Sequence, residues 1–185
     1  MKGIVRLNRA TTIVLFSLAA VSAFGQSEPS KLQYEVYSAF LRIQLLDKNG
    51  IADALRVGDG GSAIAPDIVA FKKRLTQQRL SEIKARFEGL ESDTLDSLAE
   101  CTSKSYRLAR KFTVPTEYVL VDPAGATGRY GYIQFSCVGM NRLETQAVFY
   151  VSRLKCDCAV GKWVLMQKDS DGHWAVSKES IDWIS

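Results

Sequence analysis

The sequence predicts an α+β domain: an N-terminal helix and a helical middle packed on a C-terminal antiparallel sheet of four to five strands. Three observations lead to this prediction. Apolar residues recur at helical spacing over residues 31–46. Further helical stretches occupy the middle third of the chain. From residue 132 onward, apolar and polar residues alternate with a period of two, which is typical of strands.

The first 25 residues have the pattern of an export signal. Three bases open the segment, an uncharged apolar run follows, and Ala23-Phe24-Gly25 fits a small-x-small cleavage site. The apolar core is shorter than the roughly 20 residues of a membrane span, although an uncleaved N-terminal anchor remains the alternative. We therefore expect residues 1–25 to be a signal peptide and the protein to be periplasmic or secreted.

Residues 26–185 have the length of a single α+β domain, since 160 residues lie within the usual range. This part holds 21 bases and 20 acids, a net charge of +1, because the signal carries three of the bases. Such a balance gives no reason to expect a nucleic acid as partner. No second hydrophobic span follows the signal, so we expect no membrane span in the mature chain.

The first helix is expected over residues 31–46. Ser30-x-x-Gln33 fits a capping box, in which each side chain bonds the backbone of the other residue. Val36 and Phe40 lie one turn apart on its apolar face, and Asn49-Gly50 ends the helical pattern.

The middle of the chain is expected to be mainly helical. Residues 51–57 could form a strand before it. Pro66 can occupy the first turn of a helix that continues over 67–75. A second helical run covers 81–90, and a third begins near Ser92.

The last third of the chain reads as strands. Glu117–Val121 is expected to form one, and four more form an antiparallel meander over 132–140, 145–154, 162–169 and 173–180.

The register of the last hairpin can be predicted. A three-residue loop over 170–172 would pair Trp174 with Lys168, whereas a two-residue turn at Asp171-Gly172 would pair Trp174 with Asp169. We prefer the first, because it puts the apolar residues of both strands on one face. It also places the glycine where a positive φ is needed.

Four cysteines lie in the mature chain, and an even number in an oxidising compartment suggests pairing. We prefer a local clip between Cys156 and Cys158 in a 154–161 loop, with Cys101 and Cys137 as the second pair. This is one of three partitions. Cys156 and Cys158 could instead be a redox pair or bind a soft metal, but the further ligands of a zinc site are missing at the usual spacing.

His173 is the only histidine, which excludes sites that need two or three. A hydrolase would have to use it with a serine that the sequence does not identify. The neighbouring Asp-rich turn fails as a calcium loop, because Gln167 and Lys178 would take its first and twelfth positions. We therefore expect a surface histidine, no metal and no cofactor.

Three other patterns have plain structural explanations. Residues 71–87 hold six bases and one acid and could touch an anionic surface, but we expect a solvated helix face. The glycines of 58–61 fit a flexible turn rather than a phosphate-binding loop. Aromatic residues of the meander could line a ligand cavity, but we expect them in the core; they are Phe135, Phe149, Tyr150, Trp163 and Trp174.

The two ends of the chain carry a resemblance. "YEVYSAFL" at 34–41 and "FSCVGMN", "TQAVFYV" and "LMQKDSDGHW" between 135 and 174 resemble an uncharacterised family of exported bacterial proteins. That family has a YxVYSAxL helix and an SxVGxN…TQAxxYV…LxKxxGxW meander. Met140 stands where an aromatic residue is usual, and Cys137 is not expected there. Some members have two cysteines in the corresponding hairpin loop, which implies a local clip.

The resemblance implies export but transfers no catalytic residues, since we know of no established activity for the family. By analogy alone, a curved sheet wrapped on a helix, as in cystatin or the nuclear-transport-factor domains, is a plausible shape.

Two function classes remain. The first, which we favour, is a non-catalytic envelope or secreted module that binds an envelope protein or a small ligand, because no catalytic constellation is legible. The second is a small hydrolase using His173, or a thiol-redox enzyme using Cys156 and Cys158.

Overall fold

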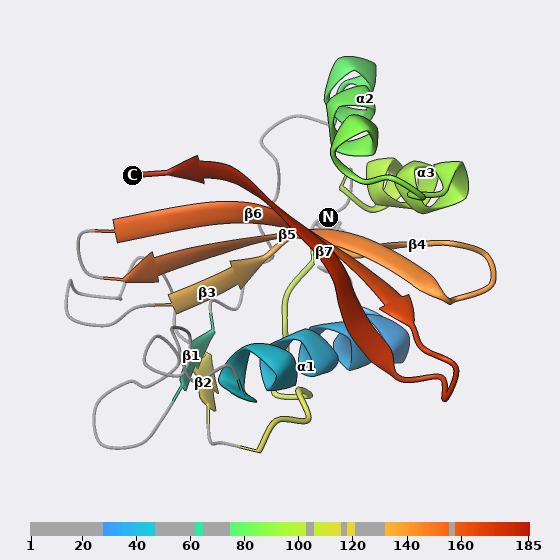
Figure 1. Ribbon diagram of the computed structural model, residues 1–185. Helices are drawn as coiled ribbons and strands as arrows, with labels where there is room; N and C mark the ends of the chain where they lie inside the picture. Colours follow the sequence, from blue (N-terminus) through green and yellow to red (C-terminus); the bar gives the residue numbers. More distant parts are fainter. Residues whose placement is uncertain are drawn as a thin grey trace, which may run out of the picture.

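The computed structural model of the chain describes residues 28–46, 62–64, 75–102, 106–115, 118–120, 132–155 and 158–185. It contains three helices and seven strands, in the order α1 (Lys31–Leu46), β1 (Ser62–Ile64), α2 (Gln77–Arg86), α3 (Ser92–Cys101), β2 (Tyr118–Leu120), β3 (Tyr132–Phe135), β4 (Gly139–Met140), β5 (Gln146–Lys155), β6 (Cys158–Lys168) and β7 (Trp174–Ile184) (Figure 1). The predictions for residues 1–25, 51–57, 58–61 and 67–75 lie outside the described residues.

The strands are joined in the order β2-β1-β3-β5-β6-β7, and β4 also pairs with β5. From β3 to β7 all pairings are antiparallel, which confirms the predicted α+β class and its antiparallel sheet. The short β1 pairs in parallel with both β2 and β3, which was not predicted. Three residues are too few to show a period, so this strand carried no signal in the sequence.

Helix α1 has the predicted bounds and the predicted cap. The backbone N–H of Ser30 donates to Gln33 Oε1 at 3.0 Å, and the N–H of Gln33 donates to Ser30 Oγ at 3.3 Å. Tyr37 and Phe40 are fully buried and pack against Phe135 of β3 and Phe149 of β5. The buried face of α1 therefore lies on the side of the sheet to which odd-numbered β5 residues point.

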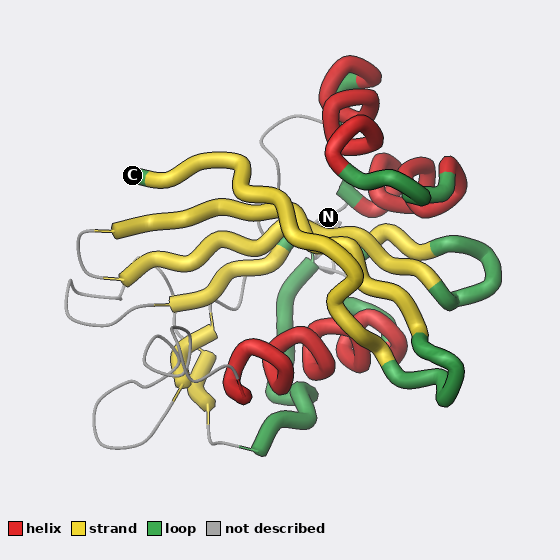
Figure 2. Tube along the Cα trace, viewed as in Figure 1, coloured by secondary structure: helices red, strands yellow, loops and turns green. Residues whose placement is uncertain are grey.

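Helices α2 and α3 lie on the opposite side of the sheet, as Figures 1 and 2 show. Gln146 of β5 faces them: its Oε1 accepts from the N–H of Glu91 and from Thr94 Oγ1, and its Nε2 donates to the carbonyl of Gly89. Gly139 of β4 lies so close to α3 that an added Cβ would be 2.5 Å from the Thr94 carbonyl oxygen. The helical middle is thus attached to the sheet by buried hydrogen bonds and by close backbone contact.

The strand expected over 132–140 is in fact two strands, β3 and β4, separated at Ser136–Val138. The N–H of Ser136 still donates to the carbonyl of Tyr150 in β5 at 2.8 Å. The N–H of Tyr150, however, donates to the hydroxyl of Ser136 at 2.8 Å rather than to its carbonyl. The interruption lets Cys137 reach Cys101 at the end of α3. The prediction of one continuous strand was therefore wrong. The alternation of apolar and polar residues cannot reveal a disulfide that leaves the plane of the sheet.

The last hairpin has the predicted register. Lys168 pairs with Trp174 and Met166 with Val176, and Gly172 has a φ of 80°. Strand β7 runs to Ile184, four residues beyond the predicted end. Its register against β6 skips Ser177 and Asp182, so each is the extra residue of a β-bulge.

No helix in the described part of the chain is both long enough and apolar enough to cross a membrane.

Candidate functional site

A groove of about 580 Å³ runs beside α1, between residues 111–113 and the tip of the β6–β7 hairpin. Six of its lining residues come from α1, and Gly172, His173 and Trp174 form the hairpin side. Three segments that are far apart in the sequence therefore meet at this hollow.

The wall at 109–113 is held by α1 itself. Tyr34 Oη accepts a hydrogen bond from the N–H of Ala109 at 2.6 Å, and Ser38 Oγ accepts from the N–H of Thr113 at 2.9 Å. Arg42 Nη1 donates to the carbonyl of Thr113 at 3.4 Å. Tyr34, Ser38 and Arg42 are spaced by one turn, so one stripe of the helix fixes this wall.

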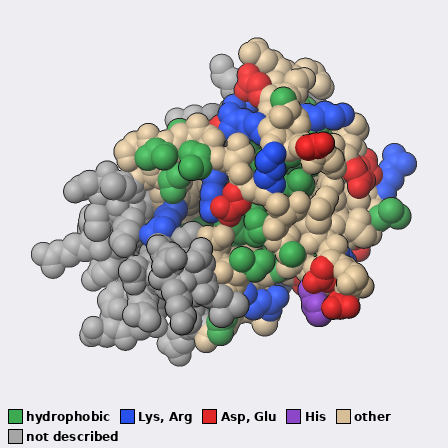
Figure 3. All heavy atoms as spheres, in the orientation of Figure 1, with side chains coloured by type: hydrophobic (Ala, Val, Ile, Leu, Met, Phe, Trp, Pro, Cys, Tyr) green, Lys and Arg blue, Asp and Glu red, His purple; other side chains and the backbone are tan. Residues whose placement is uncertain are grey.

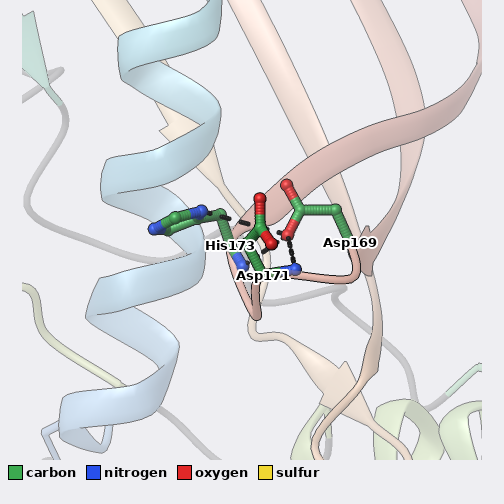
Figure 4. Close-up of side chains that lie close together, drawn as sticks. All are labelled: Asp169, Asp171 and His173. Carbon is green, nitrogen blue, oxygen red and sulfur yellow. Dashed lines mark hydrogen bonds and ion pairs between the residues drawn. The ribbon is translucent and has the colours of Figure 1, made fainter.

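The hairpin wall is held by its own loop. Asp169 Oδ1 accepts from the N–H of Asp171 at 3.0 Å and from the N–H of His173 at 2.9 Å. Lys168 Nζ lies 5.1 Å from the centre of the Trp174 ring, within cation–π distance. Figure 4 shows the imidazole of His173 pointing from this loop toward α1.

The groove is lined by three bases and one acid. Lys31 Nζ lies 3.7 Å from Glu35 Oε1, and both side chains are exposed. Lys111 Nζ lies 2.7 Å from Glu28 Oε1, and this hydrogen bond lowers the pKa of the Glu28 carboxyl. Arg42 has no carboxylate within ion-pair distance among the described residues, so it is the groove's unneutralised cation.

His173 lies at the surface, as predicted, just before the first residue of β7. Its Nδ1 is 3.9 Å from Asp169 Oδ1, and 81% of its side chain is exposed. Ligand atoms of Asp169, Asp171 and His173 lie within 4.8 Å of one another. All three residues are exposed, and Asp169 Oδ1 already accepts two backbone hydrogen bonds, so we interpret the cluster as a stabiliser of the turn.

Cys101 and Cys137 form the predicted disulfide, with 6.0 Å between their Cα atoms. Cys156 and the side chain of Cys158 lie outside the described residues, so the Cys156–Cys158 clip stays a prediction. The expected 154–161 loop is wrong in its extent. Strand β5 continues to Lys155, which pairs with Cys158 at the start of β6.

The aromatic residues of the meander are in the core, as predicted. Phe135, Phe149 and Trp163 are fully buried and Tyr150 is nearly so. Trp174 is partly buried against the core and also lines the groove. The sequence analysis did not identify Trp183 as important. Its indole N–H donates to the Tyr150 hydroxyl, and both side chains lie against the backbone of Gly161, where a Cβ would leave no room.

The basic segment 71–87 was expected to present a solvated helix face. In α2, which belongs to this segment, two arginines instead form ion pairs with β7. Arg79 and Arg86 both contact the carboxylate of Asp182, at 2.6 and 2.9 Å. Burial alone would lower the pKa of Arg79, but hydrogen bonds to Glu82 and Asp182 outweigh burial and raise the pKa. Over the face drawn in Figure 3, basic and acidic side chains are interspersed rather than gathered by sign.

Another, smaller cavity of about 200 Å³ lies between Phe40 of α1 and the sheet. Val151, Val160 and Ile181 line it, and the ion pair of Lys162 with Glu179 closes one side. Sequence reasoning identified neither cavity. The signal available for the larger one was the helical spacing of Lys31, Glu35 and Arg42 on the polar side of α1.

No protein-family model, no curated protein and no solved structure matches this chain.

Proposed function

We propose that this chain is a non-catalytic binding module, periplasmic or secreted, that holds a partner or a small ligand in the groove beside α1. The observation that carries the proposal is the construction of the groove. Its volume of about 580 Å³ lies within the range of ligand sites, roughly 300–1,000 Å³. Both walls are fixed by hydrogen bonds, so a ligand would meet a preformed surface.

Export is supported by two features. The basic and apolar leader precedes the domain, and Cys101 is joined to Cys137. Disulfides persist mainly in oxidising compartments. Cell fractionation tests this part: the processed chain is expected in the periplasm or the medium, and an intact chain among cytosolic proteins would contradict it.

The alternative of a hydrolase gains no support from His173. A general base has to lie within hydrogen-bond reach of its nucleophile. In the described part of the chain, the imidazole contacts Asp169 alone, at 3.9 Å, and is largely exposed. The thiol-redox alternative depends on Cys156 and Cys158, which thiol titration of the native protein can examine.

The binding role is tested with a blocked groove. Thr113 is exposed and lines the groove, and its backbone rather than its side chain bonds Ser38 and Arg42. Thr113→Trp should fill the groove without disturbing the core, and Thr113→Ser is the matched open control. We expect a library of fragments and short peptides, screened by NMR, to shift signals of residues 34–42, 111–113 and 172–174. These shifts should disappear in T113W and persist in T113S. Hits confined to other surfaces, or no hits, would refute the proposal.

A further inference from the structure

The cavity of about 200 Å³ beside Phe40 shares none of its described lining residues with the groove. Two neighbouring cross-strand rows form its floor, one of Val151, Lys162 and Ile181 and the other of Ile133, Arg153 and Val160. Residues two apart on a strand point to the same side of a sheet, so both rows face α1. Phe40, Ile133 and Val151 are buried, whereas Ile181 is 60% exposed and therefore forms part of the opening.

The charged residues of this cavity already have partners. Lys162 Nζ bonds both carboxylate oxygens of Glu179 at 2.7 Å, and the side chain of Lys162 is only 15% exposed. Gln44 Nε2 donates to the same carboxylate at 3.1 Å, and Arg153 is not without a partner either. A charged ligand would have to break a partly buried pair and leave one charge uncompensated, which is unfavourable. An uncharged ligand leaves the pairs intact.

The volume limits the ligand to a few heavy atoms. At about 200 Å³ the cavity is smaller than the sites of drug-sized ligands, which have roughly 300–1,000 Å³. An engineered protein cavity of about 150 Å³, lined by leucine, isoleucine and phenylalanine, binds benzene. Here Phe40, Ile133, Val151, Val160 and Ile181 provide the same kind of aromatic and aliphatic wall. A molecule of about the size of benzene therefore fits in volume and in chemistry.

A protein partner fits this place less well. A stable protein interface engages roughly 20–30 residues on each side, whereas eight residues line the cavity. The neighbouring edge of β7 is also a poor place for an added strand. It has bulges at Ser177 and Asp182, and the carbonyl of Ile181 already accepts a hydrogen bond from Arg86.

We propose that this cavity is a binding site of its own and takes an uncharged apolar molecule of about the size of benzene or toluene. The hydrocarbon lies between Phe40 and the floor, against Val151 and Val160, and the ion pair of Lys162 with Glu179 stays closed beside it. The inference goes beyond the proposed function of the groove and does not depend on it.

The probe is toluene, compared with benzoate and benzylammonium, which have nearly the same shape and carry one charge of either sign. Titration of the purified protein is followed by NMR of the methyl groups of Ile133, Val151, Val160 and Ile181. We expect saturable shifts with toluene and at least about tenfold weaker binding of both charged probes, because a charge in an apolar site lacks a partner. T113W, which blocks the groove, should leave the toluene shifts unchanged.

Two variants alter the cavity from different sides. Ile181→Asp places a charge at the opening, and Leu143→Asp is its matched control, because Leu143 is 78% exposed in the turn before β5 and does not line the cavity. Toluene should bind I181D at least about tenfold more weakly than wild type and should bind L143D as it binds wild type. Val160→Phe narrows the cavity from its floor and should weaken toluene binding as well. Melting temperatures verify that the variants fold.

The inference is overturned if toluene gives no saturable shift up to its solubility, or if it binds no better than the charged probes. Equal toluene affinities of I181D and L143D, wild-type affinity in V160F, or loss of binding in T113W would also overturn it. The fragment and peptide screen decides the function of the groove separately. Toluene shifts at the cavity without hits in the groove would support this site and refute the proposed function of the groove.

Discussion

The phenol of Tyr37 donates a 2.6 Å hydrogen bond to the backbone carbonyl of Ser136, and both residues are fully buried. The bond joins α1 to the point where β3 gives way to β4. Tyr37 belongs to the YxVYSA pattern and Ser136 to the SxVGxN pattern, so two of the sequence patterns described above meet here. Gln146 of the TQA pattern fastens the other side of the sheet to α3. These residues join the layers of the core, whereas Tyr34, Ser38 and Ala39 of the same YxVYSA pattern line the groove.

Tyr37→Phe should destabilise the protein by about 1–3 kcal/mol, because it removes a donor from a buried carbonyl. The measurement is the free energy of unfolding in urea. Tyr106→Phe is the matched control, since the Tyr106 hydroxyl has no hydrogen bond among the described residues and its loss should change stability by less than about 0.5 kcal/mol. Equal effects of the two variants would show that the Tyr37 bond contributes nothing specific.

The same tyrosine predicts a loss of stability in alkali. Burial raises the pKa of Tyr37 well above its ordinary value of about 10. Above pH 10 the unfolded chain therefore releases a proton that the folded chain keeps, which costs the folded state up to about 1.4 kcal/mol per pH unit. Below pH 10 the Tyr37 phenol keeps its proton in both the folded and the unfolded state, so its titration does not lower the free energy of unfolding there. Between pH 9 and 11 wild type should lose more stability than Tyr37→Phe, so the gap between the two should narrow; parallel curves would contradict this.

The parts of the fold that local patterns determine were predicted from the sequence. The capping box and apolar period gave the bounds of α1, and the requirement that apolar residues share one face gave the pairing of Trp174 with Lys168. Both signals act within a few residues, where side-chain chemistry decides backbone geometry.

Features that depend on distant contacts could not be predicted. The groove is built from α1, residues 111–113 and the last hairpin, and no local period relates these segments. The break at Ser136–Val138 coincides with a cross-link to α3, and the bulge at Asp182 coincides with ion pairs to two arginines more than ninety residues earlier in the chain. Asp182 lies beyond the alternating segment from which the strand was predicted.

Replacing both Cys101 and Cys137 with Ala should lower the free energy of unfolding by about 3–4 kcal/mol. The two residues are 36 positions apart, and the estimate is the loop-closure entropy for that length. Urea unfolding of the oxidised protein measures the effect. Peptide mapping without reductant should recover a fragment pair joined through Cys101 and Cys137; a fragment joining either residue to Cys156 or Cys158 would refute the pairing.

Asp182→Asn should cost about 1–2 kcal/mol and loosen α2 from β7. The Asp182 side chain is only 13% exposed and neutralises Arg79 and Arg86, which are themselves about 30% exposed, so water screens the pairs only partly. The bulge directs this carboxylate toward α2, and Arg86 also donates to the carbonyl of Ile181, which occupies part of the sheet's edge. Hydrogen exchange should quicken in residues 77–86 and 181–184 and stay unchanged in α1. Asp96→Asn, an exposed acid of α3, should leave exchange and stability as in wild type. If the two variants behave alike, Asp182 does not hold the helix, and α2 is kept in place by its buried apolar residues Leu80 and Ile83 alone.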